Sequence, residues 1–187
     1  TLPLTLFPYT TLFRSVDYLI NCLPELLKNW KTKRNCELTI LGQGYALKEF
    51  KNALGAIKGP FPRWNFRLVP WRIDMQPLQL ESEITRAHVA LIPSDPKDSL
   101  KSGVSHNRLV DSVRGGCITI ASPMDSYKEI PGIALLGEQI STLLNNAEEN
   151  YMELSRTLFT GTEEKLQQFS PEKNTKEWRD FWEKLFD

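Results

Sequence analysis

The chain has 187 residues, of which 25% are charged and 41% hydrophobic, and its 23 Lys and Arg balance its 23 Asp and Glu. A net charge of zero gives no field that would favour nucleic acid or an anionic membrane as a partner. No apolar run approaches the roughly 20 residues that a membrane-spanning helix needs. These properties indicate one ordinary domain with a real core, rather than a nucleic-acid-binding or membrane-spanning protein.

The start of the chain is interpreted as a non-native segment. Residues 5–15 read Thr-Leu-Phe-Pro-Tyr-Thr-Thr-Leu-Phe-Arg-Ser, which is the translation, without a mismatch, of a common sequencing-adapter read. A hydrophobic arm or the remnant of a signal peptide is the alternative, but Pro3 and Pro8 interrupt the apolar run. We therefore treat residues 1–15 as an artefact, exclude them from fold reasoning, and expect the natural protein to be truncated just upstream of Val16.

From residue 16 onward, helical and strand patterns alternate. Leucines on one face predict a helix over 16–30, in which Pro24 is an irregularity. Strands are predicted at 37–41, 65–69, 89–93, 117–121 and 133–136, and helices at 45–57, 78–87, in the stretch from 105 to 116, at 126–130 (one turn), over 138–169 with a break near Gly161, and at 175–186. This alternation predicts an α/β domain over 16–170, with a Rossmann-like parallel sheet flanked by helices and with C-terminal helices.

The stretch 101–123 carries the clearest chemical pattern. A polar loop that contains Lys101 leads into a short helix with a cap at Ser105, and the helix ends at Gly115-Gly116 before a buried strand. Unpaired N–H groups and the positive end of the dipole make a helix N-terminus suited to phosphate. We interpret Lys101 as a phosphate ligand, although an ordinary solvated lysine is the alternative.

The short helix is predicted to have one polar side. Asn107, Arg108 and Asp111 are three or four residues apart and should share that side, opposite a stripe of Leu109, Val110 and Val113. The polar side offers donors for phosphate and a carboxylate that accepts hydrogen bonds from sugar hydroxyls. A plain exposed carboxylate is the other explanation of Asp111.

Ligands of open parallel sheets bind at the carboxyl ends of the strands. Gly42 and Gly44 follow the strand at 37–41, Trp71 follows the strand at 65–69, and Ser122 follows the strand at 117–121. We predict that these residues line a substrate site, together with Ser105, His106 and Asn107 at the helix start. The glycines also fit a tight strand-to-helix turn, and Trp71 also fits a surface-packed aromatic.

Several rival sites are excluded. A dinucleotide fingerprint fails because Leu47 stands where a third Gly or Ala belongs, and a Walker loop and a serine nucleophile elbow are both absent. Cys22, Cys36 and Cys117 lack the spacing of metal ligands and are interpreted as free buried thiols in a reducing compartment. We therefore expect a cytoplasmic protein whose site needs no metal and no cofactor.

The stretch 101–123 also resembles the nucleotide-sugar site of retaining glycosyltransferases with the GT-B architecture, especially the large family four. Asp111 falls on the second acid of that family's Glu-x7-Glu segment, and Val-Arg-Gly-Gly-Cys-Ile-Thr-Ile-Ala-Ser matches the small residues, glycine and strand that come after that acid in the family. Gly103 takes the place of the first acid, which contacts the transferred sugar in the family. Lys101 with Asn107-Arg108 resembles a Lys…Asn-Lys/Arg variant found in some members.

The resemblance implies that the chain is the donor-binding half of a GT-B glycosyltransferase of the hexosyltransferase type. Its substrate would be a nucleoside-diphosphate sugar, with Lys101 and Arg108 as the catalytic cations and Asp111 on the ribose. Its partner would be a missing N-terminal acceptor domain, so the fragment alone would be inactive. Because Gly103 lacks a side chain, a non-catalytic glycosyltransferase-like module that binds a nucleotide or a protein is the alternative.

The last segment, 171–187, is predicted as a helix with an apolar face. That face carries Trp178, Phe181, Trp182, Leu185 and Phe186. In two-domain relatives the last helix crosses to the N-terminal domain. We therefore expect the face to lie partly bare, and full burial of all these residues within this chain would contradict the expectation.

Overall fold

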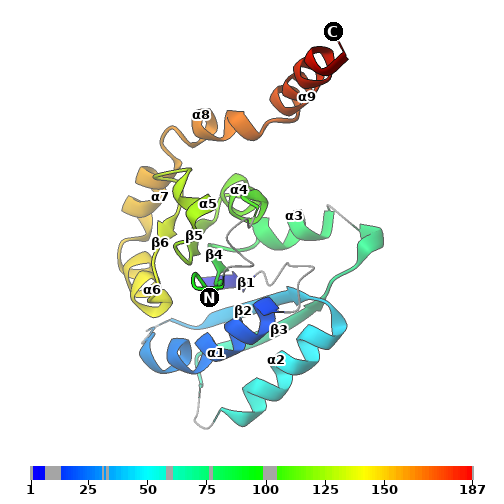
Figure 1. Ribbon diagram of the computed structural model, residues 1–187. Helices are drawn as coiled ribbons and strands as arrows, with labels where there is room; N and C mark the ends of the chain where they lie inside the picture. Colours follow the sequence, from blue (N-terminus) through cyan, green and yellow to red (C-terminus); the bar gives the residue numbers. More distant parts are fainter. Residues whose placement is uncertain are drawn as a thin grey trace.

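The computed structural model describes residues 2–6, 14–30, 32, 34–57, 61–75, 78–98 and 105–186 (Figure 1). The elements are β1 Leu2–Leu6, α1 Arg14–Asn29, β2 Cys36–Gly42, α2 Gly44–Ala56, β3 Trp64–Pro70, η1 Ile73–Met75, α3 Leu78–Thr85, β4 Val89–Ile92, α4 Asn107–Arg114, β5 Ile118–Ala121, α5 Asp125–Lys128, β6 Leu135–Leu136, α6 Ile140–Glu149, α7 Tyr151–Phe159, α8 Thr162–Leu166, η3 Gln167–Phe169 and α9 Pro171–Phe186. The predicted alternation of strands and helices is confirmed.

The strands form one parallel sheet in the order β3-β2-β1-β4-β5-β6. The chain steps outward from β1 to β3, then returns to place β4 on the other side of β1. In doubly wound sheets of this order the point of reversal is where ligands bind, outside the carboxyl ends of the strands. The predicted fold class is therefore confirmed, and the switch point lies between β1 and β4.

The first strand comes from the segment that the sequence reasoning excluded. β1 pairs with β2 on one side and with β4 on the other, with Leu4 opposite Leu38 and Val89. The exclusion rested on the match to an adapter translation, which says nothing about strand propensity. A short extended segment rich in leucine completes the ladder between two buried strands. The adapter origin of residues 5–15 stays a prediction.

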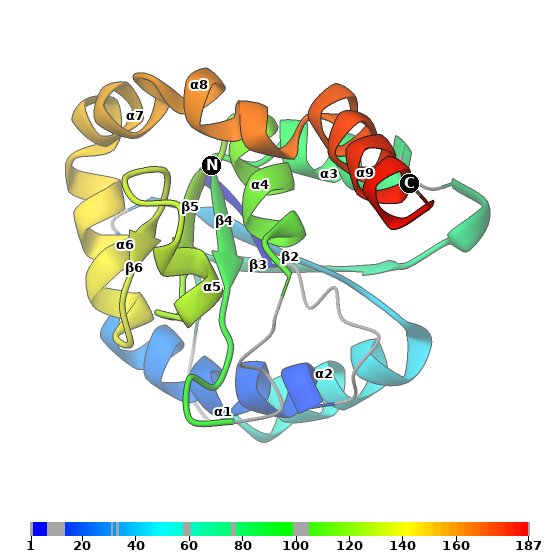
Figure 2. The same ribbon diagram turned by 45° about the horizontal axis from the view of Figure 1, so that its top comes forward.

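Helices cover both faces of the sheet, with α1 and α2 on one side and α3 and α4 on the other (Figure 2). We call the side covered by α1, α2 and α6 the apolar face, because one continuous cluster fills it, including Leu38, Phe50 and Ile120. We call the side covered by α3 and α4 the mixed face. Its apolar residues fall into two separate clusters, one around Cys117 and one around Leu109.

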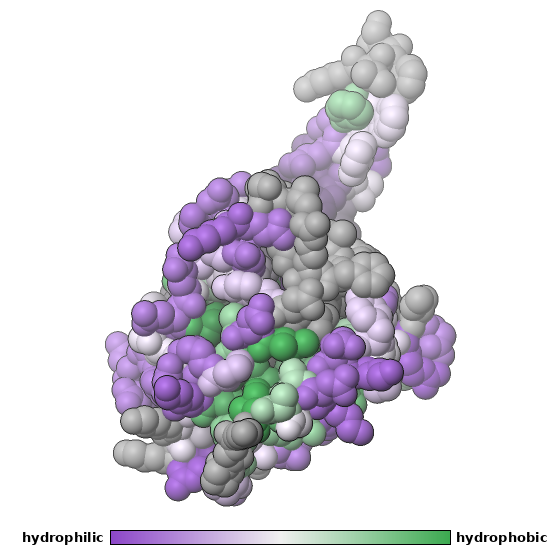
Figure 3. All heavy atoms as spheres, turned by 60° about the horizontal axis from the view of Figure 1, so that its bottom comes forward, coloured by the Kyte–Doolittle hydropathy of each residue, from purple (hydrophilic) through white to green (hydrophobic). Residues whose placement is uncertain are grey.

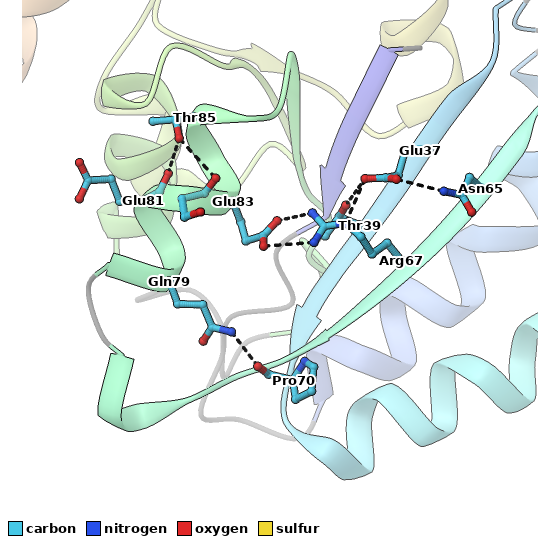
Figure 4. Close-up of polar contacts among 10 residues, drawn as sticks. Glu37, Thr39, Asn65, Arg67, Pro70, Gln79, Glu81, Glu83 and Thr85 are labelled. Carbon is cyan, nitrogen blue, oxygen red and sulfur yellow. Dashed lines mark hydrogen bonds and ion pairs between the residues drawn. The ribbon is translucent and has the colours of Figure 1, made fainter.

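Polar side chains from strands and a helix meet on the mixed face (Figure 4). The guanidinium of Arg67 on β3 donates to the carboxylate of Glu37 on β2, with 3.0 Å between Nε and Oε1, and forms a bidentate ion pair with Glu83 of α3. Asn65 also donates to Glu37, at 3.0 Å. This charged cluster ties α3 to the outer strands of the sheet.

The C-terminal helices depart from the expectation in two places. The predicted break near Gly161 is present, where the φ of this residue is +70°, but the chain also breaks at Asn150 between α6 and α7. The last helix begins at Pro171 instead of residue 175. Proline is favoured at the first position of a helix, and the hydroxyl of Ser170 accepts the Lys173 N–H. Among the described residues, no helix is long and apolar enough to cross a membrane.

Candidate functional site

The predicted site residues at the carboxyl edge of the sheet fall into separate groups. Gly42 and Trp71 form the first group, because the Trp71 N–H donates to the Gly42 carbonyl oxygen at 2.8 Å. The Trp71 ring is partly buried and packs against the cluster that contains Leu41 and Ile84. Gly44 begins α2. The alternative explanations therefore fit this arrangement. Gly42 and Gly44 lie in a strand-to-helix turn, and Trp71 is a packed aromatic residue.

Ser122 lies at the carboxyl end of β5, close to the switch point, as predicted. Its side chain is 1% exposed, and its hydroxyl oxygen accepts the backbone N–H of Ser94 at 2.9 Å. This bond joins the loop after β4 to the loop after β5. The Ser122 side chain is therefore buried at this edge and holds the Ser94 N–H.

Tyr18 of α1 reaches the same edge, which the sequence did not indicate. Burial raises the pKa of its phenol most strongly; Cys22 raises it further, and a hydrogen bond with Ser122 lowers it. Asp95, in the loop after β4, adds a small electrostatic contribution that also raises this pKa. The phenol thus links α1 to the loop that follows β5.

The N-cap of α4 is His106, one residue after the predicted Ser105, and the His106 side chain makes no capping hydrogen bond. The Asn107 N–H donates to the Ser105 hydroxyl oxygen at 3.2 Å. The His106 side chain contacts two groups, because its Nε2 lies 3.1 Å from the Glu129 carboxylate and its ring packs against Phe169. Asn107 is exposed. The Ser105 hydroxyl and the His106 ring therefore both have contacts within the chain.

The polar side predicted for α4 is divided in two. Asn107, Asp111 and Arg114 lie on the outer side, whereas Arg108 is buried at 9% exposure. The Arg108 guanidinium lies close to the phenol of Tyr127 on α5, where it lowers the pKa that burial of the phenol raises. Most of the circumference of α4 is buried, so that only every third or fourth residue is accessible to solvent. The prediction that Arg108 shares a side with Asp111 is wrong for this reason.

Asp111 lines a pocket of about 310 Å³ between α3 and α4. Leu80 and Ile84 give the pocket an apolar wall, and Glu81, Thr85, Arg114 and Gly115 complete its lining. Burial raises the pKa of Asp111, and the Arg114 charge opposes that shift. The Asp111 side chain is thus half-buried in the lining of this pocket.

The predicted helix end at Gly115-Gly116 is confirmed and has a packing reason. A Cβ on Gly115 would lie 1.8 Å from Cγ2 of Ile84, so only glycine lets α4 approach α3 this closely. Gly116 has a φ of +83°, a conformation that glycine adopts readily. Gly115 therefore fixes the wall of the Asp111 pocket, and Gly116 lets the chain turn from α4 toward β5.

Lys101 and Gly103 lie outside the described residues. Within the described part of the chain, no three His, Cys, Asp or Glu side chains are grouped so that they could hold a metal ion. Sequence reasoning missed Tyr18 and Tyr127. Tyr127 lies in the short helix that follows β5, whereas Tyr18 lies in the helix that follows β1, a strand that was not predicted.

Two solved structures show the same fold over most of this chain. A crystal structure of WaaG, a glycosyltransferase involved in lipopolysaccharide biosynthesis, matches with a TM-score of 0.55 and 17% identity over 87% of this chain and 43% of WaaG. The structure of HepE from Anabaena in complex with UDP and glucose matches with a TM-score of 0.54 and 15% identity, covering 89% of this chain and 44% of HepE. The likeness is to one half of a GT-B glycosyltransferase, and the chain spans less than half the length of either protein.

No protein-family model matches the sequence, and no curated protein matches it either.

Proposed function

We propose that this chain is the donor-binding half of a glycosyltransferase that uses a nucleoside-diphosphate sugar. The observation that carries the proposal is the placement of the α4 start at the carboxyl edge, next to the switch point, with a buried arginine in its first turn. Support comes from the likeness in fold to WaaG and HepE, the second of which was crystallised with UDP and glucose.

In the proposed reaction, charge develops on the departing diphosphate while the sugar carbon becomes oxocarbenium-like. Fixed positive charge and positioning then lower the barrier more than a side-chain nucleophile would. Arg108 and the α4 N–H groups would meet the diphosphate, together with Lys101. Asp111, in its half-buried pocket, would accept hydrogen bonds from the ribose.

The experiment is calorimetric titration of UDP and GDP into the full chain. We expect saturable binding of at least one nucleotide, and about tenfold weaker binding after Arg108→Met, since a charge-assisted hydrogen bond contributes about 1.5–3 kcal/mol. Arg156→Met is the matched control, because Arg156 is exposed on α7, away from this edge. Asp111→Asn should weaken UDP binding but not the binding of inorganic pyrophosphate. Absence of binding by the unaltered chain contradicts the proposal.

The second candidate function is that of a non-catalytic module that binds a nucleotide or a protein. Gly103 in the place of the family's first acid favours it. Binding of UDP or GDP without sugar transfer or hydrolysis by the longer parent protein would support this module. Turnover by the parent, lost on Lys101→Ala, would support the transferase.

The last helix supports a docking role within the same proposal. Trp178, Phe181 and Trp182 are 62%, 51% and 48% exposed and pack against one another. The helix α9 extends away from the rest of the domain (Figure 1). On the face of the domain that Figure 3 shows, a hydrophobic patch is surrounded by hydrophilic residues. We propose that this face packs on the acceptor domain of the parent. Tryptophan fluorescence in the parent should then shift to shorter wavelength than in this chain.

A further inference from the structure

The buried arginine of α4 has an unusual environment. Arg108 is 9% exposed, yet its guanidinium has no ion pair with a carboxylate in the described part of the chain. Buried charges in proteins are normally paired, because desolvation without a partner costs several kcal/mol. Arg67, on the same face of the sheet, shows the normal arrangement, with Glu37 and Glu83 around it.

The neighbour of Arg108 is equally unusual. Tyr127 is 0% exposed and belongs to the apolar cluster with Leu109 and Val110, the residues that follow Arg108. Within the described part of the chain, no group is placed well enough to form a hydrogen bond with its hydroxyl. A buried hydroxyl without a partner costs free energy that phenylalanine of the same shape would avoid. Packing alone therefore does not explain a tyrosine at this position.

The two features explain each other. A phenol oxygen can accept from a guanidinium N–H, and the Arg108 guanidinium is the charged group that acts on the Tyr127 hydroxyl. α5, which carries Tyr127, follows directly after the carboxyl end of β5, and Arg108 is in the first turn of α4 at the same edge. A neutral acceptor holds the arginine in place without neutralising it, which leaves its charge available to an anion.

We propose that Tyr127 is the positioning residue that holds Arg108 toward the diphosphate of a bound nucleotide. This inference rests on the proposed function and adds the group that sets the orientation of its cation. Tyr127 itself does not touch the ligand, because it is fully buried.

The test compares Tyr127→Phe with the matched control Tyr151→Phe, whose phenol is partly buried and packs against His88. Titrations of UDP and of uridine separate the diphosphate from the nucleoside. We expect Tyr127→Phe to weaken UDP binding about fivefold, because the Arg108 guanidinium loses the polar contact with the phenol oxygen, worth about 1 kcal/mol, and to leave uridine binding unchanged. The control should change neither. Equal losses for both ligands would mean a purely structural role and would overturn the inference.

A double-mutant cycle adds a second reading. If Tyr127 acts through Arg108, Tyr127→Phe should have no further effect on UDP binding in the Arg108→Met background. The same loss in both backgrounds would overturn the inference. If the unaltered chain binds UDP and Arg108→Met weakens this binding while Tyr127→Phe does not, the role of Tyr127 is refuted and the proposed function stands. If the unaltered chain binds no nucleotide, the proposed function falls with it.

Discussion

The two faces of the sheet are packed by different kinds of side chain. On the apolar face, side chains of α1, α2 and α6 form one cluster with the inward residues of β2, β4 and β5. On the mixed face, two smaller clusters leave room for Arg67 with its two glutamates, for Arg108, and for the pocket of Asp111. Continuous apolar burial fills the apolar face, whereas the mixed face also holds charged side chains.

The largest expected effect is on the apolar face. Phe50 is 0% exposed, and Phe50→Ala should lower the free energy of unfolding by about 3–5 kcal/mol, since it removes apolar burial and leaves a cavity. Urea unfolding measures the change. Leu78→Ala, at a position 66% exposed, should stay within about 0.5 kcal/mol. Similar values for both would show that burial of Phe50 in the apolar face does not stabilise the fold.

A smaller loss is expected from the charged cluster of the mixed face. Arg67→Met leaves Glu83, with a side chain 9% exposed, without its cation and should cost about 2–3 kcal/mol, below the range for fully buried pairs because Arg67 is 29% exposed. Adding Glu83→Gln should recover part of the loss. Arg72→Met, which removes an exposed ion pair with Asp74, should leave the unfolding curve unchanged. Equal effects of Arg67→Met and Arg72→Met would contradict a structural role for the cluster.

The smallest effect concerns one cysteine from each face. Burial raises the pKa of Cys36, on the apolar face, and of Cys117, on the mixed face, to about 12 from an ordinary 9.0. Since the unfolded thiols ionise first, their contribution to stability is complete below pH 9 and is lost as the pH rises toward 12. Each thiol should lower stability by about 1.4 kcal/mol per pH unit in that window.

Urea unfolding between pH 8 and pH 10 measures this slope. Cys117→Ala should remove the share of one thiol, and Cys36→Ala should remove a similar share. A slope that is the same in Cys117→Ala as in the unaltered chain would show that the Cys117 thiol does not carry the effect.

The sequence predicted elements better than it predicted side-chain surroundings. Strand β4 was predicted from a continuous apolar run, and helix α4 from a serine before it and a pair of glycines after it. Both elements are present, because these signals act within a few residues of the chain. The surroundings of Arg108 were predicted wrongly, because helical spacing places a residue on a side but does not say which neighbour covers it. Tyr127 was missed for the same reason.

By itself, the sequence determined the alternation of strands and helices, the parallel sheet that results from it, and the location of polar residues near strand ends. Those features depend on local propensity and on the spacing of apolar residues, which does not depend on which element packs against them. Tertiary structure alone decided that Leu2–Leu6 fills the centre of the sheet, that the Ser122 hydroxyl is buried against Ser94, and that Arg108 lies beside Tyr127. These contacts join residues far apart in the chain, and their free energy depends on desolvation and packing that no short segment encodes.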